Sequence, residues 1–309
     1  MTSCYSSLVP AVAADLSQLH DVTHASRLRA LAAAAGGTLL ALDAAGPLAT
    51  VAWATCAGNG SCSLAAAVLP SEALVAALAT ALAAAAAAGP ARTVADRPQA
   101  AGATAAVVGQ GTLGEGSPQA STDRRPRLRG LAIGIGPGSF TGLRVALSAA
   151  KGLAWGASAL IYPVCSLALL ACSAGPGWYI PVADARQGRL FSGLFEVTTA
   201  GELRLQAATA VRSAAEIRDL QAQGQALALR TAAAPVLIAC ALPQATSGQA
   251  SPDYPWATAL GLSAPRPVIP WAGAALLLAA AAIRCGAGAD LAALAPTYGQ
   301  PLAIDQVLA

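Results

Sequence analysis

The chain has 309 residues, of which 11% are charged, and its formal net charge is +3 at pH 7. Hydrophobic residue types reach 56% while aromatic types reach only 4%, and 83 residues are alanine, so most of the apolar character comes from methyl groups. The small net charge argues against a general polyanion binder, and the apolar content argues against a chain that is disordered throughout. The length suits one large or two modest domains.

The seven cysteines are scattered and form no C-x-x-C pair. This pattern predicts reduced thiols in a cytoplasmic protein, rather than a disulfide framework or a zinc ribbon. Residues 152–183 carry no charge and are long enough to span a bilayer. Glycine and proline residues divide this stretch into short pieces, so no contact with a membrane is expected.

Residues 1–37 are polar and irregular, and they predict a flexible N-terminal extension. Both histidines, His20 and His24, lie there. At a spacing of four residues they could grip a metal ion on a helix, but a solvated pair is the favoured interpretation. The rest of the chain has no histidine to act as a general base near neutral pH.

The first ordered half is expected over residues 38–164. The runs TLLALD and LATVAWAT, separated by AAGP, predict a hairpin whose first strand ends at Asp43. A helix is predicted over 71–88, with Ser71 as its N-cap and Gly89-Pro90 as its stop. Residues 89–129 have low complexity and predict a flexible insertion. Its arginines 124, 125, 127 and 129 are interpreted as solubilising, with contact to RNA phosphates as the alternative.

Order returns at Leu131, where a strand, a glycine turn and a helix are predicted, and a second hairpin follows with Asp184 at the end of its first strand. Each half therefore opens with strand, Asp, turn and strand. This weak repeat resembles the duplicated ribonuclease H-like core of the actin and sugar-kinase (ASKHA) superfamily. We expect an α/β fold of two subdomains, the second over residues 165–309.

The glycine turn offers one candidate site. Glycines there could let backbone amides approach a phosphate at the N-terminus of the following helix, although a tight turn with close helix packing is the favoured alternative. The two Asp residues could hold magnesium, or could cap their turns. The candidate nucleotide- or anion-binding residues are Asp43, Gly136, Gly138, Ser139, Thr141 and Asp184.

The segment GIGPGSFTGLRVALSAAKGLAWG closely resembles the signature of the TsaB family of bacterial tRNA threonylcarbamoyladenosine biosynthesis proteins, which are also described as glycoprotease-like. The resemblance extends to LLALDAAGPLATVAWA, SEALVAALATAL, VADARQGRLFSGLF and LAPTYGQP. It covers residues 38–300 apart from the insertion. The family's D-T-S opening is D-A-A here, at Asp43, Ala44 and Ala45.

The resemblance implies a scaffold subunit without catalytic residues, cofactor or metal of its own. Its partners would be a TsaD-like catalytic subunit and a TsaE-like ATPase, and the complex would use ATP and a metal ion. The reaction would transfer threonylcarbamoyl to the adenosine beside the anticodon of tRNAs that read ANN codons, so tRNA would be met through the complex. A homodimer is a further expectation. The alternative function is an ASKHA-type ATP-dependent kinase or phosphatase that uses Asp43 and Asp184.

The helix after the glycine turn predicts a partner surface. At 100° per residue, one stripe of larger apolar residues should pack on the chain's own sheet, and the opposite stripe holds small residues where a solvent face would be charged. An alanine-rich composition could place small residues on any surface, which is the alternative. The expected interface residues on this helix are Val145, Ser148, Ala149, Gly152 and Gly156. The family resemblance implies that the helix predicted over 71–88 joins the same surface, through Ser71 and Leu74.

Overall fold

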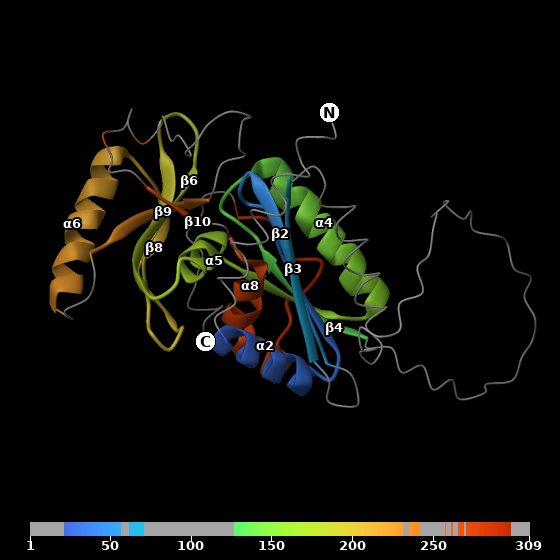
Figure 1. The fold of residues 1–309 in the computed structure, drawn as a ribbon. Helices are drawn as coiled ribbons and strands as arrows, with labels where there is room; N and C mark the ends of the chain where they lie inside the picture. Colours follow the sequence, from blue (N-terminus) through green and yellow to red (C-terminus); the bar gives the residue numbers. More distant parts are fainter. Residues whose placement is uncertain are drawn as a thin grey trace, which may run out of the picture.

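A computed structural model describes residues 22–56, 62–70, 127–230, 235–241, 257, 261, 265–268 and 270–297. Two five-stranded sheets lie side by side, each with helices packed against it (Figure 1). The first sheet contains β1 (Thr38–Asp43), β2 (Leu48–Cys56), β3 (Cys62–Pro70), β4 (Leu128–Gly134) and β5 (Leu160–Val164). The second contains β6 (Gly177–Asp184), β7 (Leu190–Val197), β8 (Leu203–Arg212), β9 (Leu237–Ala241) and β10 (Arg266–Val268).

Both sheets follow one plan. The orders are β3-β2-β1-β4-β5 and β8-β7-β6-β9-β10, when the second is read from its β8 edge. In each sheet the first three strands along the chain form an antiparallel meander. The fourth strand pairs parallel with the first, and the fifth pairs parallel with the fourth. The duplicated, ASKHA-like α/β fold expected from the sequence is confirmed.

The first sheet is covered on both faces because its central strand β1 is apolar throughout. Leu40 and Leu42 point to the face covered by α4 (Phe140–Ala157), and Leu39 and Ala41 point to the other face. Around the second sheet, α6 (Ala214–Arg230) covers one face, and α5 (Ser166–Ser173) packs on the other, between the two sheets. Each sheet therefore contributes side chains to a hydrophobic core on both of its faces, as is usual where strands pair in parallel.

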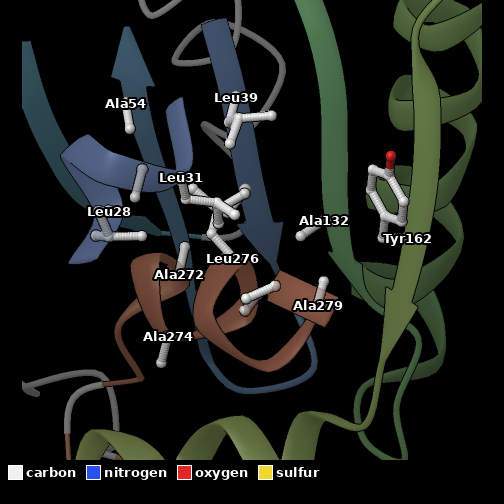
Figure 2. Close-up of a cluster of buried hydrophobic side chains, with 14 of the residues drawn as sticks. Leu28, Leu31, Leu39, Ala54, Ala132, Tyr162, Ala272, Ala274, Leu276 and Ala279 are labelled. Carbon is white, nitrogen blue, oxygen red and sulfur yellow. The ribbon is translucent and has the colours of Figure 1, made fainter. Parts of the chain in front are cut away.

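Helix α2 (Val22–Ala35) corrects the prediction of a flexible extension over residues 1–37. Its Leu28, Leu31 and Ala32 are buried against the first sheet, and Figure 2 shows Leu28 and Leu31 turned toward residues of α8. The stripe is apolar at spacings of three and four residues. It was overlooked because alanine supplies most of it. The N-terminal part of the extension, residues 1–21, lies outside the described residues.

The end of the chain corrects the second domain boundary. Helices α8 (Ala272–Leu278) and α9 (Ala280–Cys285) belong mainly to the core of the first sheet, although a domain over 165–309 would place them on the second, which only Leu278 among their described residues contacts in its core. Ala272 and Leu276 are instead buried with Leu39 of β1 in the core of the first subdomain (Figure 2). The first subdomain is thus built from both ends of the chain.

The cysteine prediction is wrong at one pair, since Cys56 and Cys62 form a disulfide. The two residues lie opposite each other in the β2–β3 ladder, with Cα atoms 4.2 Å apart. The free cysteines in the described part of the chain are Cys165, Cys172, Cys240 and Cys285.

The bounds of several other predicted segments can be compared with the structure. Strand β4 begins at Leu128, so the end of the predicted insertion at 129 is two residues too late. The predicted helix over 71–88 and residues 89–126 lie outside the described residues. Within the described ranges, no helix combines the length and hydropathy needed to cross a bilayer.

Candidate functional site

The end of the first hairpin meets the glycine turn because β1 and β4 are parallel neighbours. Leu42 pairs with Ile133, so Asp43 and Gly134 finish their strands at the same edge of the sheet. A Cβ on Gly134 would overlap the Oδ1 atom of Asp43. Glycine at this position therefore makes room for the carboxylate.

Asp43 is 2% exposed and lies against the first turn of α5. Its Oδ1 accepts the Ser166 hydroxyl at 2.6 Å, and its Oδ2 accepts the Ala45 N–H at 3.4 Å. The Ser166 hydroxyl oxygen in turn accepts the Gly136 N–H at 3.1 Å. Burial raises the pKa of Asp43, and the two hydrogen bonds to its carboxylate oppose the rise.

The glycine turn packs directly on the backbone of the first hairpin. A Cβ on Gly138 would overlap the carbonyl oxygen of Ala45, and one on Gly142 would overlap that of Ala44. The Ser139 N–H donates to the Ala45 carbonyl at 2.7 Å. Ser139 also caps α4, since its hydroxyl accepts the Gly142 N–H at 3.2 Å. The glycines thus serve close approach of two backbone segments.

This junction does not fit the phosphates of a nucleotide. The N–H groups of Gly136, Ser139 and Gly142 donate to the chain's own oxygens, and the carbonyls of Ala44 and Ala45 stand over Gly138 and Gly142. The remaining predicted residue of the turn, Thr141, is exposed at the start of α4. The structure brings these residues together, and the N–H groups of Gly136, Ser139 and Gly142 bond within the fold.

Asp184 lies in a different environment. It ends β6 in the second sheet with its side chain 61% exposed, and its Oδ1 accepts the Arg186 N–H at 2.7 Å. Arg186 also pairs with it at 3.5 Å. This is the turn-capping geometry of an Asx turn. Among the described residues, no group of three or more His, Cys, Asp and Glu side chains is placed to hold a metal ion.

The second candidate site is the outward face of α4. The inward stripe is buried on the first sheet as predicted, and it consists of Leu143, Leu147, Ala150 and Ala154. Of the expected interface residues on the other stripe, Val145 is 37% exposed, Ser148, Gly152 and Gly156 are exposed, and Ala149 is half-buried. A Cβ on Gly152 or Gly156 would meet open space. Ser71 and Leu74 lie outside the described residues.

One large apolar side chain on this face was missed, since Trp155 is 81% exposed. Phe140 is 53% exposed as well, but it lies about 120° around the helix from Gly152, and the Arg144 guanidinium lies 3.7 Å from the centroid of its ring. Trp155 follows Ser148 by seven residues, so it lies on the same stripe, and counting at 100° per residue could have found it. We call Val145, Ser148, Gly152, Trp155 and Gly156 the α4 outer face. An exposed tryptophan beside small residues is typical of a protein-binding surface.

The fold and the hairpin–turn junction define a class: ASKHA-like α/β proteins with two ribonuclease H-like subdomains. A solved structure of a Pseudomonas aeruginosa protein with similarity to peptidase YeaZ matches with a TM-score of 0.52 and 22% identity, over 85% of this chain and 100% of that chain. YeaZ from Pseudomonas aeruginosa matches with a TM-score of 0.51 and 20% identity, over 84% of this chain and 100% of that chain.

Two sequence comparisons agree with this class. Residues 121–263, less than half of the chain, match the model of the TsaD family, tRNA N6-adenosine threonylcarbamoyltransferase. The tRNA threonylcarbamoyladenosine biosynthesis protein TsaB of Bacillus subtilis (strain 168) is 38% identical over 68 residues, which are 21% of this chain and 30% of that protein. The chain is thus similar to TsaB over part of its sequence and to YeaZ in its fold.

Proposed function

We propose that this chain is a non-catalytic scaffold subunit in the synthesis of threonylcarbamoyladenosine in tRNA. Similarity to TsaB and the match to the TsaD family model support a role in this modification. The catalytic partner would be a TsaD-like subunit that shares the duplicated fold, and a TsaE-like ATPase would act with the pair. ATP and a metal ion would then belong to the complex rather than to this chain.

The α4 outer face is the observation that carries the scaffold role. An isolated solvent face of a helix is usually charged, whereas this one presents Trp155 beside Gly152 and Gly156. Small residues allow a second helix to approach closely, and a neighbouring tryptophan supplies a large contact area. A related subunit with a matching helix is the partner that this surface fits.

The geometry gives less support to a kinase or phosphatase. Such an enzyme would need Asp43 and Asp184 to face one bound nucleotide. Asp43 is instead buried and bonded to Ser166, while Asp184 caps a turn in the other sheet.

The test is co-purification of the full chain with a TsaD-like subunit from the same source, followed by threonylcarbamoylation of tRNA by the complex with the ATPase and the activated substrate present. Gly152→Arg places a long charged side chain on the α4 outer face, where the glycine has open space, so the variant should fold. It should fail to co-elute and should not restore modification.

Ala226→Arg is the matched control, because Ala226 is exposed on α6 of the second subdomain. It should bind the partner like the unmodified chain. Unchanged binding by Gly152→Arg would remove α4 from the interface. Turnover of ATP by the isolated chain, abolished by Asp43→Asn, would favour the enzyme instead.

A further inference from the structure

A cavity of about 240 Å³ lies where the two subdomains meet, on the side of the first sheet opposite α4. Its walls come from α2, α5, α8, α9 and the loop that joins β7 to β8. A second hollow of about 220 Å³ continues between α2 and α9. Arg27 of α2 and Arg284 of α9 line both spaces.

The cavity carries an excess of positive charge. Arg27 donates one of its N–H groups to the Ala200 carbonyl at 2.9 Å, and a guanidinium has four others to offer. Arg284 is exposed and forms no hydrogen bond or ion pair with any residue in the described part of the chain. The carboxylate in the wall, Glu202, already pairs with Arg204 at 3.6 Å. Two arginines therefore face the space without a carboxylate of their own.

Much of the remaining lining is aliphatic. Trp271 also lines the cavity, but it is only 4% exposed, and the His24 ring lies 5.9 Å from its ring, centroid to centroid, at an interplanar angle of 52°. Leu277 and Ala281 add aliphatic surface. Cys172 also lines the space, but burial raises the pKa of its thiol to about 12, so it stays protonated and does not add negative charge.

We propose that this cavity binds a small organic phosphate, with the phosphate between Arg27 and Arg284 and a one-ring body against the aliphatic surface of Leu277 and Ala281. Guanidinium groups match the geometry of phosphate oxygens. The volume is below the range of about 300–1,000 Å³ that is typical of sites for drug-sized ligands, which limits the body to a single ring. This site is independent of the scaffold role, because it does not include any residue of the α4 outer face.

Isothermal titration calorimetry of the full chain with phenyl phosphate at low salt tests the proposal. One site should saturate, and Arg284→Gln should weaken binding at least tenfold without affecting folding, because its side chain is exposed and unpaired. Arg27→Gln should weaken it similarly. Ala281→Phe should block the cavity while both guanidinium groups remain. Phenol and inorganic phosphate should each bind more weakly than phenyl phosphate.

Arg29→Gln is the matched control, since Arg29 lies on the same helix and does not line the cavity. The affinities of Arg29→Gln and of Gly152→Arg for phenyl phosphate should equal that of the unmodified chain. The proposal is overturned by a lack of saturable binding, by an equal loss in Arg29→Gln, or by inorganic phosphate binding as tightly as phenyl phosphate.

Discussion

The Ser166 hydroxyl donates to the Asp43 carboxylate over 2.6 Å, and it joins the first residue of α5 to the last residue of β1. The two residues are 123 positions apart in the chain. Because Ser166 also accepts the Gly136 N–H, three segments meet at one hydroxyl group. The buried carboxyl at this position ties the glycine turn, the first hairpin and α5 together.

The stability of the Asp43→Asn variant, relative to that of the unmodified chain, should increase as the pH rises. The folded state raises the pKa of Asp43 above its ordinary value of 3.8, so the folded protein holds this proton more tightly than the unfolded chain does. The stability from this group is complete below about pH 3.8 and is lost as the pH rises through the folded pKa. Asn carries no charge to bury and can still accept from Ser166.

Urea unfolding at several pH values between about 4 and 7 measures this effect. The free energy of unfolding of Asp43→Asn, minus that of the unmodified chain, should increase with pH. Asp184→Asn removes an exposed carboxylate at the corresponding hairpin, and it controls for the loss of one charge. A difference that stays constant over this range would contradict the burial argument.

Gly138→Ala should destabilise the fold by about 1–3 kcal/mol or more, because the added methyl would overlap the Ala45 carbonyl in a packed core. Gly152→Ala makes the same chemical change in open space on a helix, and it should stabilise by about 0.5–1 kcal/mol. Thermal unfolding of both variants checks the pair. Equal effects would show that the turn tolerates a side chain and that close backbone contact does not matter there.

Leu28→Ala should cost about 2–5 kcal/mol of unfolding free energy, since Leu28 is fully buried between α2 and the first sheet. Arg29→Ala on the exposed side of the same helix should change stability by no more than about 0.5 kcal/mol. Urea unfolding of the full chain distinguishes them. If Leu28→Ala matched Arg29→Ala, α2 would not be part of the core.

Trp155→Ala should weaken binding to a TsaD-like subunit by about 2 kcal/mol or more, because an exposed tryptophan in a contact surface contributes strongly to binding. Folding should be unaffected, since little of this side chain is buried. Leu229→Ala, which truncates a side chain 69% exposed on α6, is the control and should leave affinity unchanged. Surface plasmon resonance gives both values, and equal affinities for Trp155→Ala and the unmodified chain would contradict the proposed interface.

The sequence predicted those elements whose signals are local. The run TLLALD is apolar without interruption, and β1 has these bounds in the structure. The glycine turn and α4 follow from glycine spacing, the Ser139 cap and an amphipathic stripe. Helix α2 escaped detection because alanines, which suit a core and a solvent face alike, form much of its apolar stripe.

Partners across long stretches of chain could not be predicted in the same way. Nothing near Asp43 in the sequence marks Ser166 as its partner, because the contact depends on how α5 is placed after β5. The same holds for α8, whose apolar residues fit either sheet in composition. Trp155 could have been found, since its position on the outward stripe follows from counting alone.

The return of α8 and α9 to the first sheet sets the order in which the protein can be completed during synthesis. Strands β1 to β5 leave the ribosome long before residues 272–285, yet the core that contains Leu39 of β1 is complete only when Leu276 joins it. The second sheet, whose strands and covering helices lie between residues 166 and 268, has its own core available earlier. The nascent first subdomain therefore exposes an apolar face until residues 272–285 have been synthesised, which makes it the half that needs protection from aggregation.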